Sequence, residues 1–238
     1  MQKLDTMKAD ERRELWESLS VVEDYLAGGP RRPRVALDFE AAADWAAERT
    51  ALAAPREGDS LEAIAAEVLA CRACRLCEKR KQAVPGQGPE SPLAMVVGEG
   101  PGADEDESGL PFVGPAGKLL DKMLSSIALS RETNCFIANV VKCRPPQNRD
   151  PSADEQAACL GYLRRQIALL RPKAILCAGR IASGALLRTP EGVGKLRGAW
   201  RDFEGTPLLV TYHPSALLRD DAYKRPAWED LKLFRERI

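Results

Sequence analysis

Short apolar runs alternate with segments of helical composition from residue 91 to the end of the chain. The apolar runs are typical of buried strands and fall at residues 93–98, 134–141, 173–178 and 208–212. The helical segments fall at residues 115–128, 153–170 and 180–187. Strands that alternate with helices predict an open sheet covered by helices on both faces. We therefore expect an α/β fold, a three-layer α/β/α domain with a central, mostly parallel sheet.

The first seventy residues have a different pattern. Apolar residues at helical spacing predict helices at 4–26 and 40–54, separated by a Gly-Gly-Pro stop and a basic linker. Ser60 is placed to cap a third helix at 61–70, which leads to Cys71. We therefore divide the chain into a helical N-terminal extension, residues 1–70, without assigned chemistry, and a main domain, residues 71–238.

Composition and charge narrow the functional classes. The chain has 238 residues and 45% apolar content, enough for one main domain with its own core. It has neither the apolar segment of a signal peptide nor a run of membrane-spanning length, so we expect a cytoplasmic protein with no membrane partner. Residues 1–70 hold 9 Lys/Arg against 15 Asp/Glu, and the remainder holds 26 against 20. This modest basic excess is compatible with phosphate contacts but does not by itself identify a nucleic-acid binder.

Seven cysteines in a chain without a signal peptide favour metal binding over disulfides. Cys135 and Cys177 lie in the apolar runs, where a buried thiol needs no further role. Four others form an uneven set that suits an inorganic centre joining two distant segments: Cys71, Cys74, Cys143 and Cys159. Zinc is the nearest alternative, but structural zinc sites usually bring two close pairs of ligands, so an iron–sulfur cluster fits better. Cys77 is a spare thiol, because the further cysteine and proline of a ferredoxin-like run are missing.

Three loops that follow predicted strands carry the candidate functional residues, because ligands of open parallel sheets bind beyond the carboxyl ends of the strands. The first is the glycine-rich loop Gly98-Glu99-Gly100-Pro101-Gly102, which lacks phosphate-loop and dinucleotide-binding spacings. The second begins at Asn139, whose amide can both donate to and accept from the edge of a base. The third begins at His213, the only histidine, so no conventional Ser-His-Asp triad is assumed. A turn asparagine and a structural histidine are the alternative interpretations.

Four motifs in this order resemble the family 4 uracil-DNA glycosylases, the bacterial and archaeal iron–sulfur enzymes of base excision repair. They are the glycine loop with its acidic tail, Gly109-Leu110-Pro111-Phe112-Val113-Gly114, residues 139–148 and residues 213–219. The resemblance extends from Cys71 to about Arg235 and implies hydrolysis of the bond between uracil and deoxyribose, which leaves an abasic site. It also implies a [4Fe-4S] cluster held by Cys71, Cys74, Cys143 and Cys159. The implied partner is uracil-containing DNA, single- or double-stranded, and we expect a monomer.

The resemblance also assigns roles in the base pocket. Phe112 is expected to stack on a flipped base, Asn139 to bind its edge, and neutral His213 to donate to its O2. Glu99 is the candidate for orienting the attacking water, and Asn148 is a second candidate for holding that water. A wedge that enters the duplex is expected at Leu217, Leu218 and Arg219, with Arg144 and Arg149 near phosphates.

The sequence departs from the family's pattern in places. Gly100 is a substrate-binding candidate, but it stands where the better-known family of uracil-DNA glycosylases has an aspartate, so water activation is expected to differ. Residues 1–70 have no counterpart in the family's pattern. A relative captures uracil-DNA covalently through a histidine in an inserted basic loop. Residues 144–150 have no histidine and no insertion, which disfavours covalent capture here. A non-catalytic iron–sulfur DNA-binding module and an electron-transfer protein are the rival functions.

Overall fold

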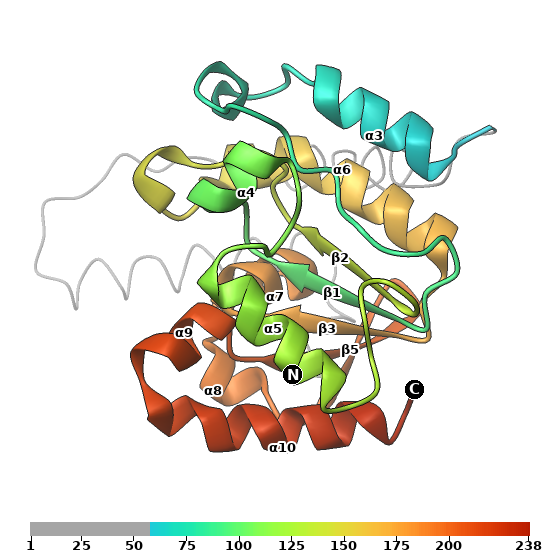
Figure 1. The fold of residues 1–238 in the computed structure, drawn as a ribbon, viewed down its shortest axis with the longest axis vertical. Coiled ribbons are helices and arrows are strands. Elements are labelled where there is room, and N and C mark those ends of the chain that lie inside the picture. Colours follow the sequence, from blue (N-terminus) through green and yellow to red (C-terminus); the bar gives the residue numbers. More distant parts are fainter. Residues whose placement is uncertain (1–57) are drawn as a thin grey trace, which may run out of the picture. The chain divides into compact units, whose positions relative to one another are not determined.

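The computed structural model describes residues 58–238, so the helices predicted at 4–26 and 40–54 lie outside the described residues. At its centre is a five-stranded sheet with the order β2-β1-β3-β5-β4 (Figure 1). The strands are β1 (Ala94–Gly98), β2 (Cys135–Asn139), β3 (Ala174–Ala178), β4 (Trp200–Phe203) and β5 (Thr206–Thr211). Every pairing is parallel except that of β4 with β5, so the predicted mostly parallel sheet is confirmed.

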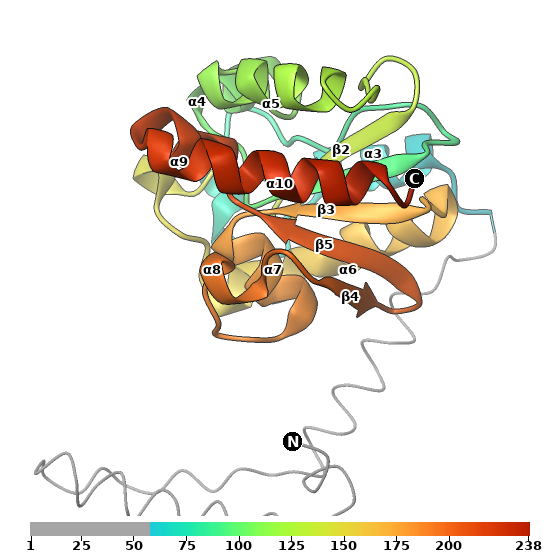
Figure 2. The same cartoon turned by 90° about the horizontal axis from the view of Figure 1, so that it is seen from below.

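Helices cover both faces of this sheet (Figure 2). One layer contains α5 (Pro115–Ser125) and α10 (Lys224–Arg235), and the other contains α6 (Ala153–Leu170) and α7 (Arg180–Leu187). Alternate residues of each strand point to opposite faces, so Met95 and Val97 pack in the core under α6, whereas Ala94 and Val96 pack in the core under α5 and α10. The three-layer α/β/α architecture is therefore confirmed.

Several short elements were missed by the hydrophobic pattern. They are the helices α4 (Ala103–Ser108), α8 (Val193–Leu196) and α9 (Pro214–Arg219), and the 3₁₀ turns η1 (Arg75–Glu78), η2 (Pro146–Asn148) and η3 (Asp221–Tyr223). Elements this short do not complete enough turns to show a periodicity. Helix α10 was missed because its buried stripe is sparse, with Ala227, Leu231 and Phe234 among charged residues.

The antiparallel strand β4 was also missed. Its hairpin with β5 turns at Glu204 and Gly205, which have φ of 51° and 87°. Positive φ at both central residues is the geometry of the two-residue turn that best matches the twist of a hairpin. The pair Glu-Gly is a weak sequence signal for such a turn, since Asn-Gly and Asp-Gly are the usual ones.

Helix α3 (Leu61–Ala70), which the sequence pattern assigned to the N-terminal extension, packs against a helix of the main domain. Ser60 caps it as expected, since its Oγ accepts from the backbone N–H of Ala63 at 3.1 Å. The helix packs against α6, and Arg165 of α6 donates to both Asp59 and Glu67. No helix within residues 58–238 has the length and apolar content needed to cross a membrane.

Candidate active site

A cavity of about 910 Å³ opens at the carboxyl ends of the parallel strands. After β1 the chain adds β2 on one side of β1, and it later adds β3 and β5 on the other side. A crevice forms at the point where the strand order of a parallel sheet reverses in this way. Most of the residues predicted for the pocket line this cavity: Glu99, Gly100, Phe112, Asn139, Asn148, His213 and Arg219. The structure therefore brings together residues that are up to 120 positions apart in the sequence.

Asn139 is the last residue of β2 and pairs in register with Gly98, the last residue of β1. Its side chain is buried, and its Oδ1 has no hydrogen-bond partner within residues 58–238. A Cβ at position 98 would lie 2.5 Å from this Oδ1 and 2.5 Å from Cζ of Phe112, so only glycine lets both groups approach the strand end. A buried acceptor left unpaired costs about 1–3 kcal/mol, which a donating ligand would recover.

Phe112 lies beside His213, with 5.5 Å between the ring centroids. Its backbone has a φ of 53°, a left-handed conformation that is uncommon for an aromatic residue. Glu105 stabilises the loop around it, because its Oε1 accepts from the backbone N–H groups of Val113 and Gly114 at 2.8 and 3.0 Å. Sequence reasoning treated Glu105 only as part of an acidic tail. The Gly-x-x-Glu spacing before a short helix, a variant of the capping box, could have indicated it.

His213 presents a defined tautomer to the cavity. Its Nδ1 accepts from the backbone N–H of Ser215 at 3.2 Å and lies 2.8 Å from Ser215 Oγ. A neutral ring that accepts at Nδ1 carries its proton on Nε2. Burial, and secondarily the charge of Arg219, lower the pKa of His213 to about 4, so the ring is neutral at physiological pH.

Glu99 is a carboxyl group with a perturbed pKa. Burial and then the neighbouring Asp150 raise the pKa of Glu99 to about 7, while Arg180 opposes this shift. Asp150 and Arg180 form an ion pair with each other at the cavity wall. A carboxyl group with a pKa near 7 can act as a base near neutral pH.

Gly100 has a steric reason for its identity. A Cβ at this position would lie 2.7 Å from Cγ2 of Val141, which follows β2. An aspartate here would force Val141 to move. The absence of a second carboxylate next to Glu99 is therefore built into the packing of these two loops.

Asn148 lines the cavity from the loop between β2 and α6. Its Oδ1 accepts from Arg144 Nε at 2.8 Å, and its φ is 54°. Arg149 donates to both carboxylate oxygens of Glu155, at 2.8 and 2.7 Å, and this pairing lowers the pKa of Glu155 to about 2. Arg149 therefore forms an ion pair that holds this loop against the start of α6, and its place near phosphates stays a prediction.

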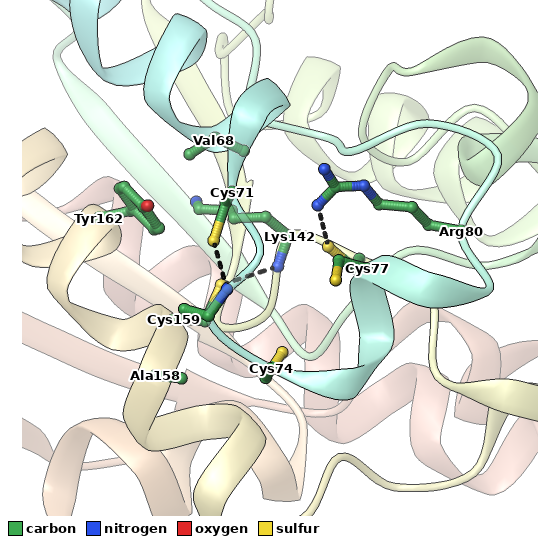
Figure 3. Close-up of a pocket in the computed structure, with 11 residues that line it drawn as sticks. Val68, Cys71, Cys74, Cys77, Arg80, Lys142, Ala158, Cys159 and Tyr162 are labelled. Atoms are coloured by element: carbon green, nitrogen blue, oxygen red, sulfur yellow. Dashed lines mark hydrogen bonds between the residues drawn. The ribbon is translucent and has the colours of Figure 1, made fainter.

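A second, much smaller cavity is lined by cysteines. Cys71 follows α3, Cys74 precedes η1, Cys143 lies in the loop after β2, and Cys159 lies in α6. The spare thiol of Cys77 lines it as well. Figure 3 shows Cys71, Cys74, Cys77 and Cys159 around this common space. Within residues 58–238, no set of three or more acidic, histidine or cysteine side chains is arranged for a single metal ion.

The surroundings of these thiols contain donors to sulfur. The guanidinium of Arg80 donates to Cys143 Sγ at 3.0 Å, and the backbone N–H of Lys142 donates to Cys159 Sγ at 3.2 Å. Lys142 is fully buried, and its Nζ donates to Gln166 Oε1 at 2.8 Å. N–H groups and cations of this kind stabilise anionic sulfur ligands in iron–sulfur proteins.

Comparison with known proteins identifies the family of the chain. The uracil DNA glycosylase superfamily matches residues 85–232. A type-4 uracil-DNA glycosylase of Saccharolobus solfataricus is 44% identical over 190 residues, which cover 76% of this chain and 87% of that protein. The chain belongs to the type-4 uracil-DNA glycosylases. A second member, from Pyrobaculum aerophilum, is 44% identical over 174 residues, or 69% of this chain and 87% of that protein.

In this type-4 uracil-DNA glycosylase the three residues predicted to form a wedge have different environments. Leu217 is buried in the core under α5 and α10, with 3% of its surface exposed, so it does not point toward a ligand. Leu218 is 52% exposed, and Arg219 lines the main cavity. Leu217 therefore faces the core and Leu218 faces solvent, because alternate sides of the short helix α9 face the core and solvent. The wedge at these three residues stays a prediction.

Proposed function

We propose that this chain hydrolyses the N-glycosidic bond of deoxyuridine in DNA, releasing uracil and leaving an abasic site for base excision repair. Family membership supports the reaction, and the single observation that carries the assignment of the site is the unpartnered, buried Oδ1 of Asn139. A base inside a duplex is out of reach of such a pocket, so the deoxyuridine must be flipped or met in a single strand.

Asn139 would read the edge of the flipped base. Its free Oδ1 would accept from uracil N3–H, and its Nδ2 would donate to uracil O4. Cytosine has the opposite pattern at these two positions, with an acceptor at N3 and a donor at C4. Cytosine would therefore leave buried groups unpaired, and mismatches of this kind can cost on the order of 10⁴ in selectivity.

Phe112 and His213 would hold and activate the leaving base. The ring of Phe112 would stack on uracil. His213, neutral and protonated on Nε2, would donate to uracil O2 as the C1′–N1 bond breaks and negative charge builds on the base. A preorganised donor of this kind contributes about 3 kcal/mol to lowering the barrier.

Glu99 would orient the water that adds to C1′ and would accept its proton. With a pKa of about 7, the carboxyl group is partly ionised at neutral pH and retains the basicity that proton transfer requires. Asn148 lines the same cavity and would be the second group that holds this water.

The four cysteines Cys71, Cys74, Cys143 and Cys159 would hold a [4Fe-4S] cluster. Their thiols fit such a group, because they surround one cavity and receive N–H donors, with the cations of Arg80 and Lys142 close by. Hydrolysis needs no electron, so a bound cluster would supply a structural tie. The tie joins the end of α3, the loop after β2 and helix α6.

The DNA partner would be gripped next to the base pocket. Leu218 projects from α9 and would enter the gap that the flipped nucleotide leaves, with Arg219 near phosphates. Single- and double-stranded DNA, a monomeric protein and a cytoplasmic location stay predictions.

A uracil-release assay tests the proposal. The purified, iron-containing protein is incubated with matched oligonucleotides that carry one deoxyuridine, thymidine or deoxycytidine, each single-stranded and in duplex. Alkali-labile cleavage only at deoxyuridine is expected. Binding to all the oligonucleotides without release of any base would instead favour the non-catalytic DNA-binding module.

A further inference from the structure

Arg131 lies in the loop between α5 and β2 and is almost completely buried, with 9% of its side chain exposed. All five N–H groups of its guanidinium donate within the protein. Nη1 donates to Pro111 O at 2.7 Å and Gln87 Oε1 at 3.2 Å, and Nη2 donates to Phe112 O at 2.8 Å. Nε and Nη2 both donate to Asp121 Oδ1, at 2.9 and 2.7 Å.

Two of these bonds hold the backbone that orients Phe112. The carbonyls of Pro111 and Phe112 flank the φ of Phe112, which at 53° is left-handed. This backbone conformation costs a non-glycine residue about 1–3 kcal/mol, so it persists only where surrounding contacts offset the strain. The surroundings also include Gly117 of α5, where a Cβ would overlap the Phe112 carbonyl.

A guanidinium is suited to this position because its planar fork reaches two carbonyls and a carboxylate at once. Asp121 of α5 anchors one edge of the fork, and Gln87 comes from the segment before β1. Arg131 thus connects α5, the segment before β1 and its own loop to the turn that carries the aromatic ring. Arg131 itself does not line the cavity.

We propose that Arg131 is a positioning residue for the base pocket. It holds the Phe112 backbone in its left-handed conformation, so that the ring lies against Gly98 and the Asn139 amide, where a flipped base stacks. The inference rests on the proposed role of Phe112 in uracil excision. It assigns to Arg131 an effect on catalysis that acts only through the Phe112 ring.

A double-mutant cycle tests this coupling. Single-turnover uracil release is measured for the wild type, Arg131→Met, Phe112→Ala and the double variant, together with inhibition by free uracil. Arg131→Met is expected to slow release by about 10- to 100-fold and to weaken uracil inhibition in parallel, because small misplacements in an active site have effects of this size. In the Phe112→Ala background the same change is expected to slow release less than about twofold, since no ring remains to be positioned.

Arg164→Met is the matched control. Arg164 is also buried and also pairs with one half-exposed carboxylate, that of Glu204, at 2.7 Å. It lies in α6, which packs on the sheet face opposite to the core cluster that contains Phe112. Its replacement is expected to lower the melting temperature while leaving single-turnover release and uracil inhibition within about twofold of the wild type.

The outcomes separate the two claims. Equal slowing by Arg131→Met in both backgrounds, or unchanged release by Arg131→Met, would overturn the positioning role. Normal release by Phe112→Ala would overturn the proposed role of Phe112 instead. If Arg131→Met does not fold, Arg131→Lys replaces it in the same cycle, because lysine keeps the charge but cannot reach both carbonyls and Asp121.

Discussion

The base pocket and the cysteine cavity are built in different ways. The pocket lies on the ends of adjacent parallel strands, where the register of the sheet fixes Gly98 opposite Asn139. The cysteines instead come from the end of α3, from the edge of η1, from a loop and from α6. No sheet hydrogen bonds join these four segments. The sheet itself therefore positions the base-reading groups, whereas the cysteine region depends on side-chain interactions between separate segments.

The two regions meet in one loop. Asn139 ends β2, and Cys143 follows four residues later. The Arg165 pairs with Asp59 and Glu67 add a second tie, since they hold α3 against α6. Loss of the cysteine site is therefore expected to reach the pocket through this loop, while loss of a pocket residue should leave the cysteine site intact.

His213→Ala and Asn139→Ala are expected to give the two largest effects. His213→Ala removes the Nε2–H donor, and losing one such donor slows an enzyme by about 10²–10³-fold. Single-turnover uracil release measures the loss, and the iron content should be unchanged. Ser215→Ala is the comparison, because the backbone N–H of Ser215 still fixes Nδ1 when the hydroxyl is gone. A rate for His213→Ala within threefold of the wild type contradicts the leaving-group role.

Glu99→Gln is expected to slow release by about 10²-fold and to remove its pH dependence near neutrality. In the wild type, release should rise as pH passes through 7, where Glu99 ionises, because His213 with its pKa of about 4 stays neutral throughout.

As pH rises, the contribution of Glu99 to the stability of the folded protein should fall while the release rate rises. A raised carboxyl pKa means that the folded state binds the proton more tightly, so Glu99 costs stability as pH rises from 4.5 to about 7. After allowance for solvent screening the cost is about 1–2 kcal/mol. Glu99→Gln should therefore unfold at higher urea than the wild type at pH 8 and at similar urea at pH 4.5. Parallel pH profiles for both proteins would refute the assignment.

Cys143→Ser is expected to affect both regions. The purified variant should lose iron and its brown colour, and release should slow by about 10- to 100-fold as the loop after Asn139 loosens. Cys177→Ser is the control, since Cys177 is buried in β3 and does not line the cysteine cavity. That variant should keep its iron and lose only stability. A colourless Cys143→Ser protein with full activity would exclude the structural tie.

The sequence predicted the sheet, and it placed several pocket candidates at one edge of that sheet, for identifiable reasons. Buried strands are short apolar runs, and the residues that follow them meet at one edge, so Asn139 and His213 could be placed without coordinates. The exposure of individual residues was harder to predict. Leu217 and Leu218 are neighbours of equal hydrophobicity, and only the phase of α9 decides which is buried.

The contacts of Arg131 were beyond the reach of sequence reasoning for a related reason. Arg131 donates to backbone carbonyls of a distant loop, and hydrogen bonds to carbonyls leave no residue pattern. The packing of α3 on α6 is likewise a tertiary contact that the sequence pattern does not show. The positions of the helices 4–26 and 40–54 stay predictions.

Leu218→Ala is expected to give the smallest effect of the series. Its side chain is exposed, so stability should change by less than about 0.5 kcal/mol, while release from duplex DNA should slow several-fold and release from single strands should not. Leu217→Ala is the matched neighbour and should instead lose about 2–4 kcal/mol of stability, because its side chain fills the core. Urea unfolding and release from both substrates distinguish the two. Equal effects of the two changes on stability would contradict the phase of α9.

The central claim is that the amide of Asn139, held at the end of the sheet with a free acceptor, reads the edge of uracil. The most direct measurement is single-turnover release from an oligonucleotide with one deoxyuridine, for the wild type and Asn139→Ala, with iron content and melting temperature recorded for both. The rate of release by Asn139→Ala is expected to be lower by about 10²–10⁴-fold, and the variant should retain its iron. An equal rate for the two proteins would contradict it.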